Sequence, residues 1–301
     1  MRARCIMLNR SYLVTRRCSD RRFFLRPCEH TRRIFQYCLA HAAERYGILI
    51  HGYCCLSNHY HITLTDPFGL LPAFMADLNR TISKAVGATI DRWGGFFEAG
   101  TYSAVDLADT DAIVRKTAYT LGNPVTAGLV RRALLWPGAT SIGWRSGTKR
   151  TFERPETSYF GPNSTMPKQV SLRLEPPSGM DAARFDREVR NLVHATEQEA
   201  RETLRREHRK VLGPRRVLRQ DPYDSPTSWA ERRGMNPKVA TTDKWKRIEA
   251  LERNKKWYEA YREALALFRA GVRDVIFPYG TYAMVRHLGV RCEPAPVGAS
   301  P

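Results

Sequence analysis

The sequence predicts an α+β fold, in which a ferredoxin-like antiparallel sheet carries helices on one face and a mainly helical extension follows. In the first half, β-rich runs and runs with helical periodicity alternate in the order β-α-β-β-α, with one further strand. Glycines and prolines then break the periodicity between 137 and 179, and two long helical patterns follow. We therefore expect a compact domain over 1–145, a Pro/Gly-rich connector over 146–180 and a basic, mainly helical region over 181–301.

The first elements of this domain follow from local composition. A strand is expected at 11–15, and a helix over 31–46 ends at Gly47, a natural C-cap. The apolar face of this helix comprises Ile34, Phe35, Cys38, Leu39 and Ala42. Two β-rich strands follow between 48 and 65, and Asp66-Pro67 stops the second one.

The next elements alternate in the same way. A helix over 70–93 ends at Gly94-Gly95, and aromatic and apolar residues between 96 and 105 predict a short strand pair. Thr110-Asp111 then caps a helix that carries Tyr119. In the C-terminal region, helical patterns cover 181–212 and 242–270, and a β-rich, aromatic tail covers 275–291.

His59 and His61 stand on either side of Tyr60 in one of the expected strands. Because side chains alternate along a strand, both imidazoles point to one face and Tyr60 points to the apolar layer behind it. This geometry suits a metal chelate. The alternative is that the two histidines are hydrogen-bonded structural or surface residues, which is the more frequent role of a lone His-x-His pair.

Tyr119 and Asn123 share one face of the helix that follows, because they are spaced i, i+4. A tyrosine can act as a covalent nucleophile when a nearby cation favours its phenolate, since its reference pKa is about 10. Lys116, one helical turn earlier, is an auxiliary cation for this purpose. The alternative is that Tyr119 is a half-buried aromatic of an amphipathic helix.

The ligand types favour Mg²⁺ or Mn²⁺ over structural zinc. Two imidazoles and an amide oxygen from Asn123 would leave coordination positions open for phosphate oxygens. A closed zinc site needs four protein ligands, usually with cysteine, and the seven cysteines form no C-x-x-C pair. The pattern therefore excludes a zinc finger.

Two motifs resemble those of the HUH single-tyrosine transposases, in particular the REP-associated tyrosine transposases and their insertion-sequence relatives. The first is LSNHYH at 56–61 and the second is YTLGNPVTAGLV at 119–130, in matching order and spacing. Further similarity at 16–18, 23–27, 97–103 and 136–138 extends the resemblance over roughly 8–145. The chain departs from the pattern at Ser57, where proline is common, and at Thr126, where a basic residue is common.

The resemblance implies a ferredoxin-like domain that cuts single-stranded DNA beside a small hairpin, through a 5′-phosphotyrosyl intermediate and a free 3′-hydroxyl. It implies metal ligation by His59 and His61, with Asn123 at the position of a third polar ligand. Tyr119 matches the nucleophile. As DNA-binding candidates we take the basic residues Arg16, Arg17, Arg80, Lys84 and Lys116.

Two other functions stay open. A protein with the same fold could bind hairpin DNA or RNA without cutting it, although the intact histidines and tyrosine argue against loss of activity. A replication initiator or relaxase uses similar metal histidines, but places them after the tyrosine or adds a third histidine. The order of motifs in this chain disfavours that class.

The charge of the chain favours a nucleic-acid partner. It has 49 Lys+Arg against 30 Asp+Glu, a formal net charge of +19 and an isoelectric point near 10.0. Arginines concentrate between 201 and 219, where they could follow a DNA backbone. Equally, this run could be an exposed helix face paired with neighbouring glutamates at 197, 199, 202 and 207.

The sequence contains no apolar stretch long enough to cross a membrane, and its first residues lack the apolar region of a signal peptide. We therefore expect a cytoplasmic protein, nucleoid-associated when bound to DNA, with reduced cysteines. The patterns do not separate a monomer from a homodimer.

Overall fold

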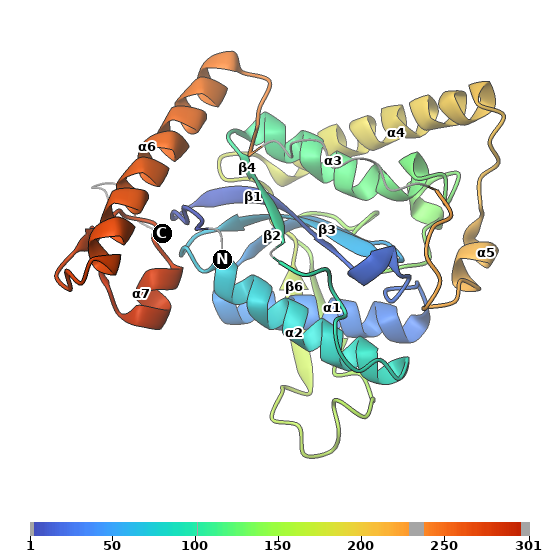
Figure 1. Ribbon diagram of the computed structural model, residues 1–301. Helices are drawn as coiled ribbons and strands as arrows, with labels where there is room; N and C mark the ends of the chain where they lie inside the picture. Colours follow the sequence, from blue (N-terminus) through green and yellow to red (C-terminus); the bar gives the residue numbers. More distant parts are fainter. Residues whose placement is uncertain (1–2, 101, 229–237, 296–301) are drawn as a thin grey trace.

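A five-stranded sheet forms the centre of the computed structural model, which describes residues 3–100, 102–228 and 238–295 (Figure 1). The strand order is β2-β3-β1-β4-β7. The strands are β1 (Arg10–Arg17), β2 (Leu49–Cys55), β3 (His59–Asp66), β4 (Ser103–Leu107) and β7 (Val239–Ala240). β1 pairs antiparallel with β3 over its whole length, so that Thr15 lies opposite His61 and Arg17 opposite His59.

Helices cover both faces of this sheet. α1 (Glu29–Tyr46) and α2 (Leu71–Thr89) lie on one face, and α3 (Thr110–Thr126) and α4 (Ala182–Arg206) lie on the other (Figure 1). The predicted α+β class and the helical C-terminal part are confirmed. The expectation of helices on one face is wrong, and β4 and β7 pair in parallel, so the sheet is mixed.

The alternation of β3 explains this two-sided arrangement. The hydroxyl of Tyr60 donates to Asn79 Oδ1 of α2 at 2.6 Å, while Thr63 Oγ1 contacts Thr117 Oγ1 of α3 at 2.9 Å. Apolar residues are buried on both sides, in one cluster with α1 and α2 and in a second with α3 and α4. A strand buried on both faces therefore keeps helices on each of them.

The segment expected as a connector contains a hairpin of β5 (Lys149–Glu153) and β6 (Gln169–Arg173), which packs against α1. The phenol of Tyr37 on α1 donates to the carbonyl of Pro167 at 2.6 Å. Short 3-10 turns occur at Ser19–Arg21 and Ala133–Leu135. The predicted boundaries at 145 and 180 stay a prediction, but both segments on either side of 180 pack onto the first domain.

The C-terminal residues form a small module with its own apolar cluster. Its elements are α6 (Lys244–Arg269), β8 (Ile276–Phe277), α7 (Ala283–Leu288) and β9 (Arg291–Cys292), preceded by the short α5 (Pro214–Leu218). The predicted last helix is confirmed, and the tail adds one helix between two short strands. No helix among the described residues is long and apolar enough to span a membrane.

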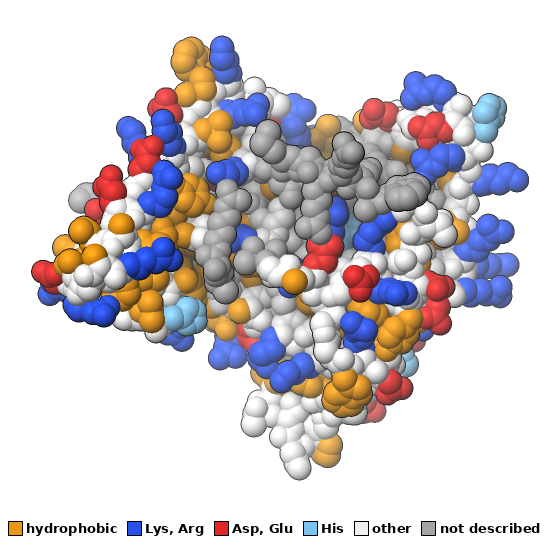
Figure 2. All heavy atoms as spheres, in the orientation of Figure 1, with side chains coloured by type: hydrophobic (Ala, Val, Ile, Leu, Met, Phe, Trp, Pro, Cys, Tyr) orange, Lys and Arg blue, Asp and Glu red, His pale blue; other side chains and the backbone are white. Residues whose placement is uncertain are grey.

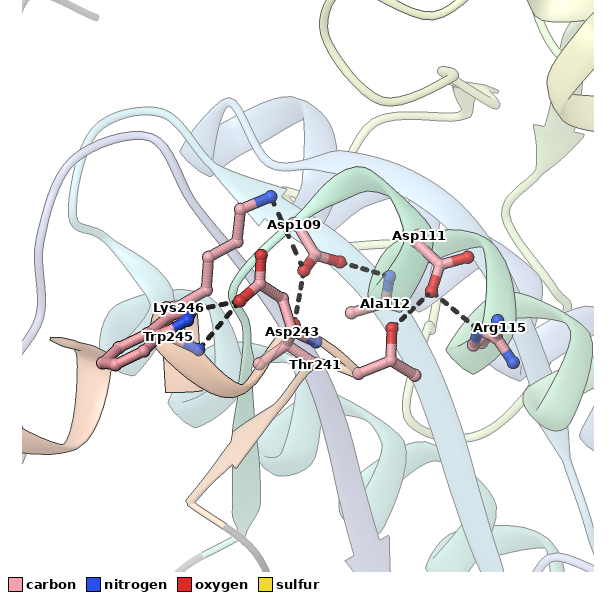
Figure 3. A network of polar contacts seen from close by, with 9 residues as sticks. Asp109, Asp111, Ala112, Arg115, Thr241, Asp243, Trp245 and Lys246 are labelled. Atoms are coloured by element: carbon pink, nitrogen blue, oxygen red, sulfur yellow. Dashed lines mark hydrogen bonds and ion pairs between the residues drawn. The ribbon is translucent and has the colours of Figure 1, made fainter. Parts of the chain in front are cut away.

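Polar contacts join this module to the first turn of α3 (Figure 3). Asp109 caps α3 by accepting from the backbone N–H of Ala112 at 2.7 Å, and its other oxygen accepts from the hydroxyl of Thr241. Lys246 Nζ lies 3.9 Å from the same carboxylate. An N-cap carboxylate also interacts favourably with the helix dipole, so this network fixes the start of the helix that carries Tyr119.

Candidate functional site

The two histidines begin β3 and point to the face covered by α3. Their ring centroids lie 4.9 Å apart with an interplanar angle of 89°. His61 is buried and His59 is partly exposed. The strand alternation predicted from the sequence therefore places the two imidazoles together, with Tyr60 buried on the other side.

Hydrogen bonds orient each imidazole. Nδ1 of His59 lies 2.7 Å from Asn58 Oδ1, and a carbonyl oxygen only accepts, so Nδ1 carries the proton. Nδ1 of His61 lies 2.8 Å from Thr15 Oγ1, and its Nε2 accepts from Asn123 Nδ2 at 3.3 Å. His59 thus keeps its Nε2 lone pair for a ligand, and a ligand at Nε2 of His61 would replace the hydrogen bond from Asn123.

Burial keeps both rings neutral near pH 7. It lowers the pKa of His59 to about 4, with a further contribution from the charge of Arg17. It lowers the pKa of His61 well below its usual value, and the charges of His59, Arg17 and Lys116 act in the same direction. A neutral imidazole is the form that binds a metal ion.

Tyr119 and Asn123 meet the histidines from α3. The Tyr119 ring lies 5.5 Å from the His61 ring in an edge contact, and its side chain is 44% exposed. Asn123, one turn later, is buried against His61. The predicted i, i+4 face of α3 is therefore the face that covers the histidines. The phenol of Tyr119 remains accessible to a substrate.

A close approach of α3 to the sheet makes this meeting geometrically feasible. Gly52 of β2 lies under α3, and a Cβ at this position would come within 2.8 Å of Thr117 Cγ2. A side chain there would push α3 outward. Gly122 similarly lets α4 approach, since its Cβ would lie 3.2 Å from Thr196 Cγ2. The two glycines thus allow α3 to pack close to the sheet and to α4, and this packing positions Tyr119 and Asn123.

Two of the predicted DNA-binding residues lie beside this site. Arg17 is opposite His59 on β1, and its charge contributes to the lowered pKa of both histidines. Lys116 Nζ lies 5.4 Å from the centroid of the Tyr119 ring. The site therefore combines two neutral imidazoles, one amide, one phenol and two cations, which is a suitable environment for a phosphodiester.

The other three predicted DNA-binding residues lie elsewhere. Arg16 donates to the carbonyl of Glu98 at 3.0 Å, on the side of the sheet away from the histidines. Arg80 is paired with Asp77 on α2, and Lys84 is exposed on the same helix. Because α2 covers the opposite face, these residues are not part of the histidine site.

The donor set fits a weakly held divalent ion better than a closed metal centre. Within the described residues, no three histidine, cysteine or acidic side chains are grouped to hold a metal. The available donors are Nε2 of His59, Nε2 of His61 and the Asn123 amide, whose oxygen and nitrogen can exchange places by a flip of χ2. This incomplete set leaves room for phosphate oxygens.

The sequence patterns did not indicate Thr15 and Asn58, which orient the imidazoles. Asn58 directly precedes His59, so its proximity was visible, but its hydrogen bond depends on the turn after β2. Thr15 depends on the register between β1 and β3, for which the sequence carries no local signal.

Comparisons with known proteins give similarity to solved structures over part of the chain. No protein-family model and no curated protein matches the chain. Among solved structures, the chain is similar to a REP-associated tyrosine transposase bound to a REP hairpin, with a TM-score of 0.41 and 14% sequence identity. The match covers 47% of this chain and 82% of that chain.

Proposed function

We propose that this protein cleaves and rejoins single-stranded DNA beside a hairpin, with Tyr119 as nucleophile and Mg²⁺ or Mn²⁺ as cofactor. The observation that supports it most strongly is the meeting of a half-exposed phenol with two neutral imidazoles from a distant part of the chain. The preference for a hairpin rests on the resemblance of the two sequence motifs.

A phenol nucleophile suits DNA in particular. DNA has no 2′-hydroxyl that could attack the neighbouring phosphate. Cleavage that keeps a phosphodiester bond for later rejoining therefore needs a nucleophile from the protein. The Tyr119 oxygen attacks phosphorus, the bond to the 3′-oxygen breaks, and the phenolic proton leaves to solvent or to that oxygen. The products are a 5′-phosphotyrosyl ester and a free 3′-hydroxyl, which can attack the ester in reverse and restore the strand.

The chain's own residues have separate roles in this proposal. His59, His61 and Asn123 would hold the divalent ion, which when bound supplies charge neutralisation at a phosphate oxygen. Thr15 and Asn58 orient the two imidazoles through hydrogen bonds to Nδ1 of each ring. Lys116, whose ammonium lies over the Tyr119 ring, would contact a phosphate held beside the phenol.

A second function, hairpin binding without cleavage, is favoured by one observation. The described residues provide no carboxylate or third histidine near the imidazole pair. A site with two imidazoles and an amide could fail to retain a metal ion at cellular concentrations. Such a protein would bind the same DNA through the same fold.

The experiment that separates the two functions is a search for a covalent adduct. Protein, Mn²⁺ and end-labelled single-stranded DNA with a hairpin are incubated and resolved under denaturing conditions. We expect a denaturant-resistant shift with wild type and none with Tyr119→Phe. The matched control is Tyr46→Phe, which removes the hydroxyl of a partly exposed tyrosine at the end of α1, on the other face of the sheet, and should leave the shift intact.

An adduct that persists in Tyr119→Phe would exclude this residue as nucleophile. Binding without any adduct, across a set of DNAs taken from the sequence around the gene, would favour the non-catalytic function.

A further inference from the structure

Residues 212–224 form a strap that crosses the end of the sheet at which His59 lies. The backbone N–H groups of Leu212 and Gly213 donate to the carbonyls of Gly128 and Leu129, at 2.9 and 3.0 Å, just after α3. The hydroxyl of Ser57, two residues before His59, donates to Gln220 Oε1 at 2.6 Å. The strap therefore contacts the segment that follows α3 and the segment that precedes β3.

The strap continues to the end of α2. The phenol of Tyr223 donates to the carbonyl of Ile90 at 2.6 Å, and the backbone N–H of Phe23 donates to the carbonyl of Asp224 at 2.9 Å. Val217 anchors the middle of the strap, because its side chain is fully buried in the cluster below α3. The strap is thus fixed at several points along its length.

The outer side of the strap is strongly basic. Arg215, Arg216 and Arg219 are exposed around the buried Val217, and none of them has an ion-pair partner among the described residues. From 201 to 219 the chain has eight Lys+Arg and two Glu, a net charge of +6. Figure 2 shows Lys and Arg side chains gathered along the edge where α4 and α5 lie.

The alternative expected from the sequence, a helix face neutralised by glutamates, applies only to α4 and its end. Arg201 pairs with Glu197, and Arg209 pairs with Glu207. No such pair involves the three strap arginines within the described residues. Exposed arginines without carboxylate partners favour binding to an external anion.

A large aromatic side chain lies at the far end of this basic surface. Trp93 is 90% exposed in the turn after α2, which the strap reaches through Ile90. The turn itself is held, because Arg92 donates to the carbonyl of Gly95 at 2.9 Å and stacks on Phe24. The Trp93 indole is therefore held in solvent on an ordered turn and does not pack against the rest of the chain. Burial of its apolar area against a partner would be favourable.

Loop contacts connect this turn to the candidate site. The backbone N–H of Ser19 donates to the carbonyl of Phe96 at 3.0 Å, and that of Cys18 donates to the carbonyl of Asn58 at 2.8 Å. The turns that contain Trp93, Asn58 and the end of β1 are therefore neighbours at one end of the sheet. His59 follows Asn58 directly.

We propose that the strap arginines and Trp93 form a binding track for the single-stranded DNA that flanks the cleaved phosphodiester. Arg215, Arg216 and Arg219 contact successive phosphates, and the Trp93 indole stacks on an unpaired base. This combination of backbone cations with an aromatic platform is how proteins bind single strands without sequence preference. A duplex lacks an exposed base face for Trp93. The inference rests on the proposed function for its choice of DNA over RNA.

Binding to oligothymidylate of about 16 nucleotides tests the track, within the range of single-strand site sizes. All variants are made in the Tyr119→Phe protein without metal, so that no cleavage intervenes. We expect Trp93→Ala to weaken binding roughly 5- to 150-fold, and Trp93→Phe to restore most of it. We expect Arg215→Gln/Arg216→Gln/Arg219→Gln to lower the slope of log affinity against log salt by about 2.

The matched control is Trp245→Ala on α6, which removes an indole that is 76% exposed in the C-terminal module. Its affinity should equal that of the parent. Equal affinity of Trp93→Ala and the parent, or an unchanged salt slope in the arginine variant, would overturn the track. If oligouridylate bound more tightly than oligothymidylate, and this binding depended on Trp93, the proposed preference for DNA would be wrong.

The outcome is independent of the covalent chemistry. If wild type forms the Tyr119 adduct but Trp93→Ala binds oligothymidylate normally, the track is wrong and the proposed function stands. If no adduct forms and binding still depends on Trp93 and the arginines, the track stands and the proposed function is wrong.

Discussion

The two faces of β3 differ in what they contribute to the protein. Tyr60, Ile62 and Leu64 face α1 and α2 and are fully buried among aromatic and aliphatic side chains. His59 and His61 face α3 and meet a phenol, an amide and two cations. One strand therefore supports a packed core and a polar site with alternate residues.

This difference explains how the site can be both polar and precisely held. The apolar face fixes the strand, and the hydrogen bonds of Thr15 and Asn58 then fix the rings on the other face. Substitutions of adjacent residues in β3 should consequently affect different properties of the protein.

The largest effect on stability is expected at Tyr60. Tyr60→Ala removes a fully buried ring that contacts Phe35 and Phe97, and its hydroxyl partner on Asn79 is left without a donor. We expect the free energy of unfolding to fall by about 3–5 kcal/mol. Chemical denaturation followed by circular dichroism measures it. A loss below about 1 kcal/mol would contradict the assignment of this face to the core.

The next effect concerns activity and is expected at His61. His61→Gln removes the Nε2 atom that we propose as a metal ligand, so we expect covalent adduct formation with Mn²⁺ to fall about a hundredfold or more. The denaturation midpoint should change far less than in Tyr60→Ala. His41→Gln, a histidine on α1, is the matched control and should keep full activity. Wild-type activity in His61→Gln would remove this histidine from the site.

A third prediction concerns His51, a buried histidine of β2 on the face of α3 and α4. Its Nδ1 bonds the carbonyl of Glu175, its Nε2 bonds Thr65 Oγ1, and burial lowers its pKa to about 4. The folded pKa lies below the unfolded value of about 6.5, so its contribution to stability is complete above pH 6.5 and is lost as the pH falls toward 4.

At pH 5 this loss amounts to about 2 kcal/mol. The unfolding free energy of His51→Gln should therefore depend less steeply on pH between 6.5 and 4 than that of wild type, while adduct formation at pH 7.5 stays close to wild type. Parallel pH profiles for the two proteins would show that His51 is not buried in its neutral form. This prediction separates a structural histidine from the site histidines on the same face.

The smallest effect is expected at Asn123. Asn123→Asp replaces a neutral amide by a carboxylate beside the imidazoles, so we expect the affinity for Mn²⁺ to rise about tenfold, because hard divalent ions prefer anionic oxygen ligands. Isothermal titration calorimetry measures the change. An unchanged affinity would indicate that Asn123 serves only as a hydrogen-bond donor to His61.

Local patterns were sufficient to predict most elements of the first domain and the grouping of the candidate site residues. Alternation placed His59 and His61 on one face, and helical spacing placed Tyr119 with Asn123. The side on which α3 packs could not be predicted, because it depends on contacts such as Thr63 with Thr117 and on the clearance at Gly52. The strap could not be predicted either, because its hydrogen bonds join residues far apart in the sequence.

The role of Tyr119 as a nucleophile that depends on His59 and His61 is tested most directly by peptide mass spectrometry of the covalent product formed with DNA and Mn²⁺. We expect one modified peptide, in which Tyr119 carries a nucleotide linked through its 5′-phosphate, and its loss in both His59→Gln and His61→Gln. Modification of another residue, or a Tyr119 product that forms equally well without the two histidines, would contradict it.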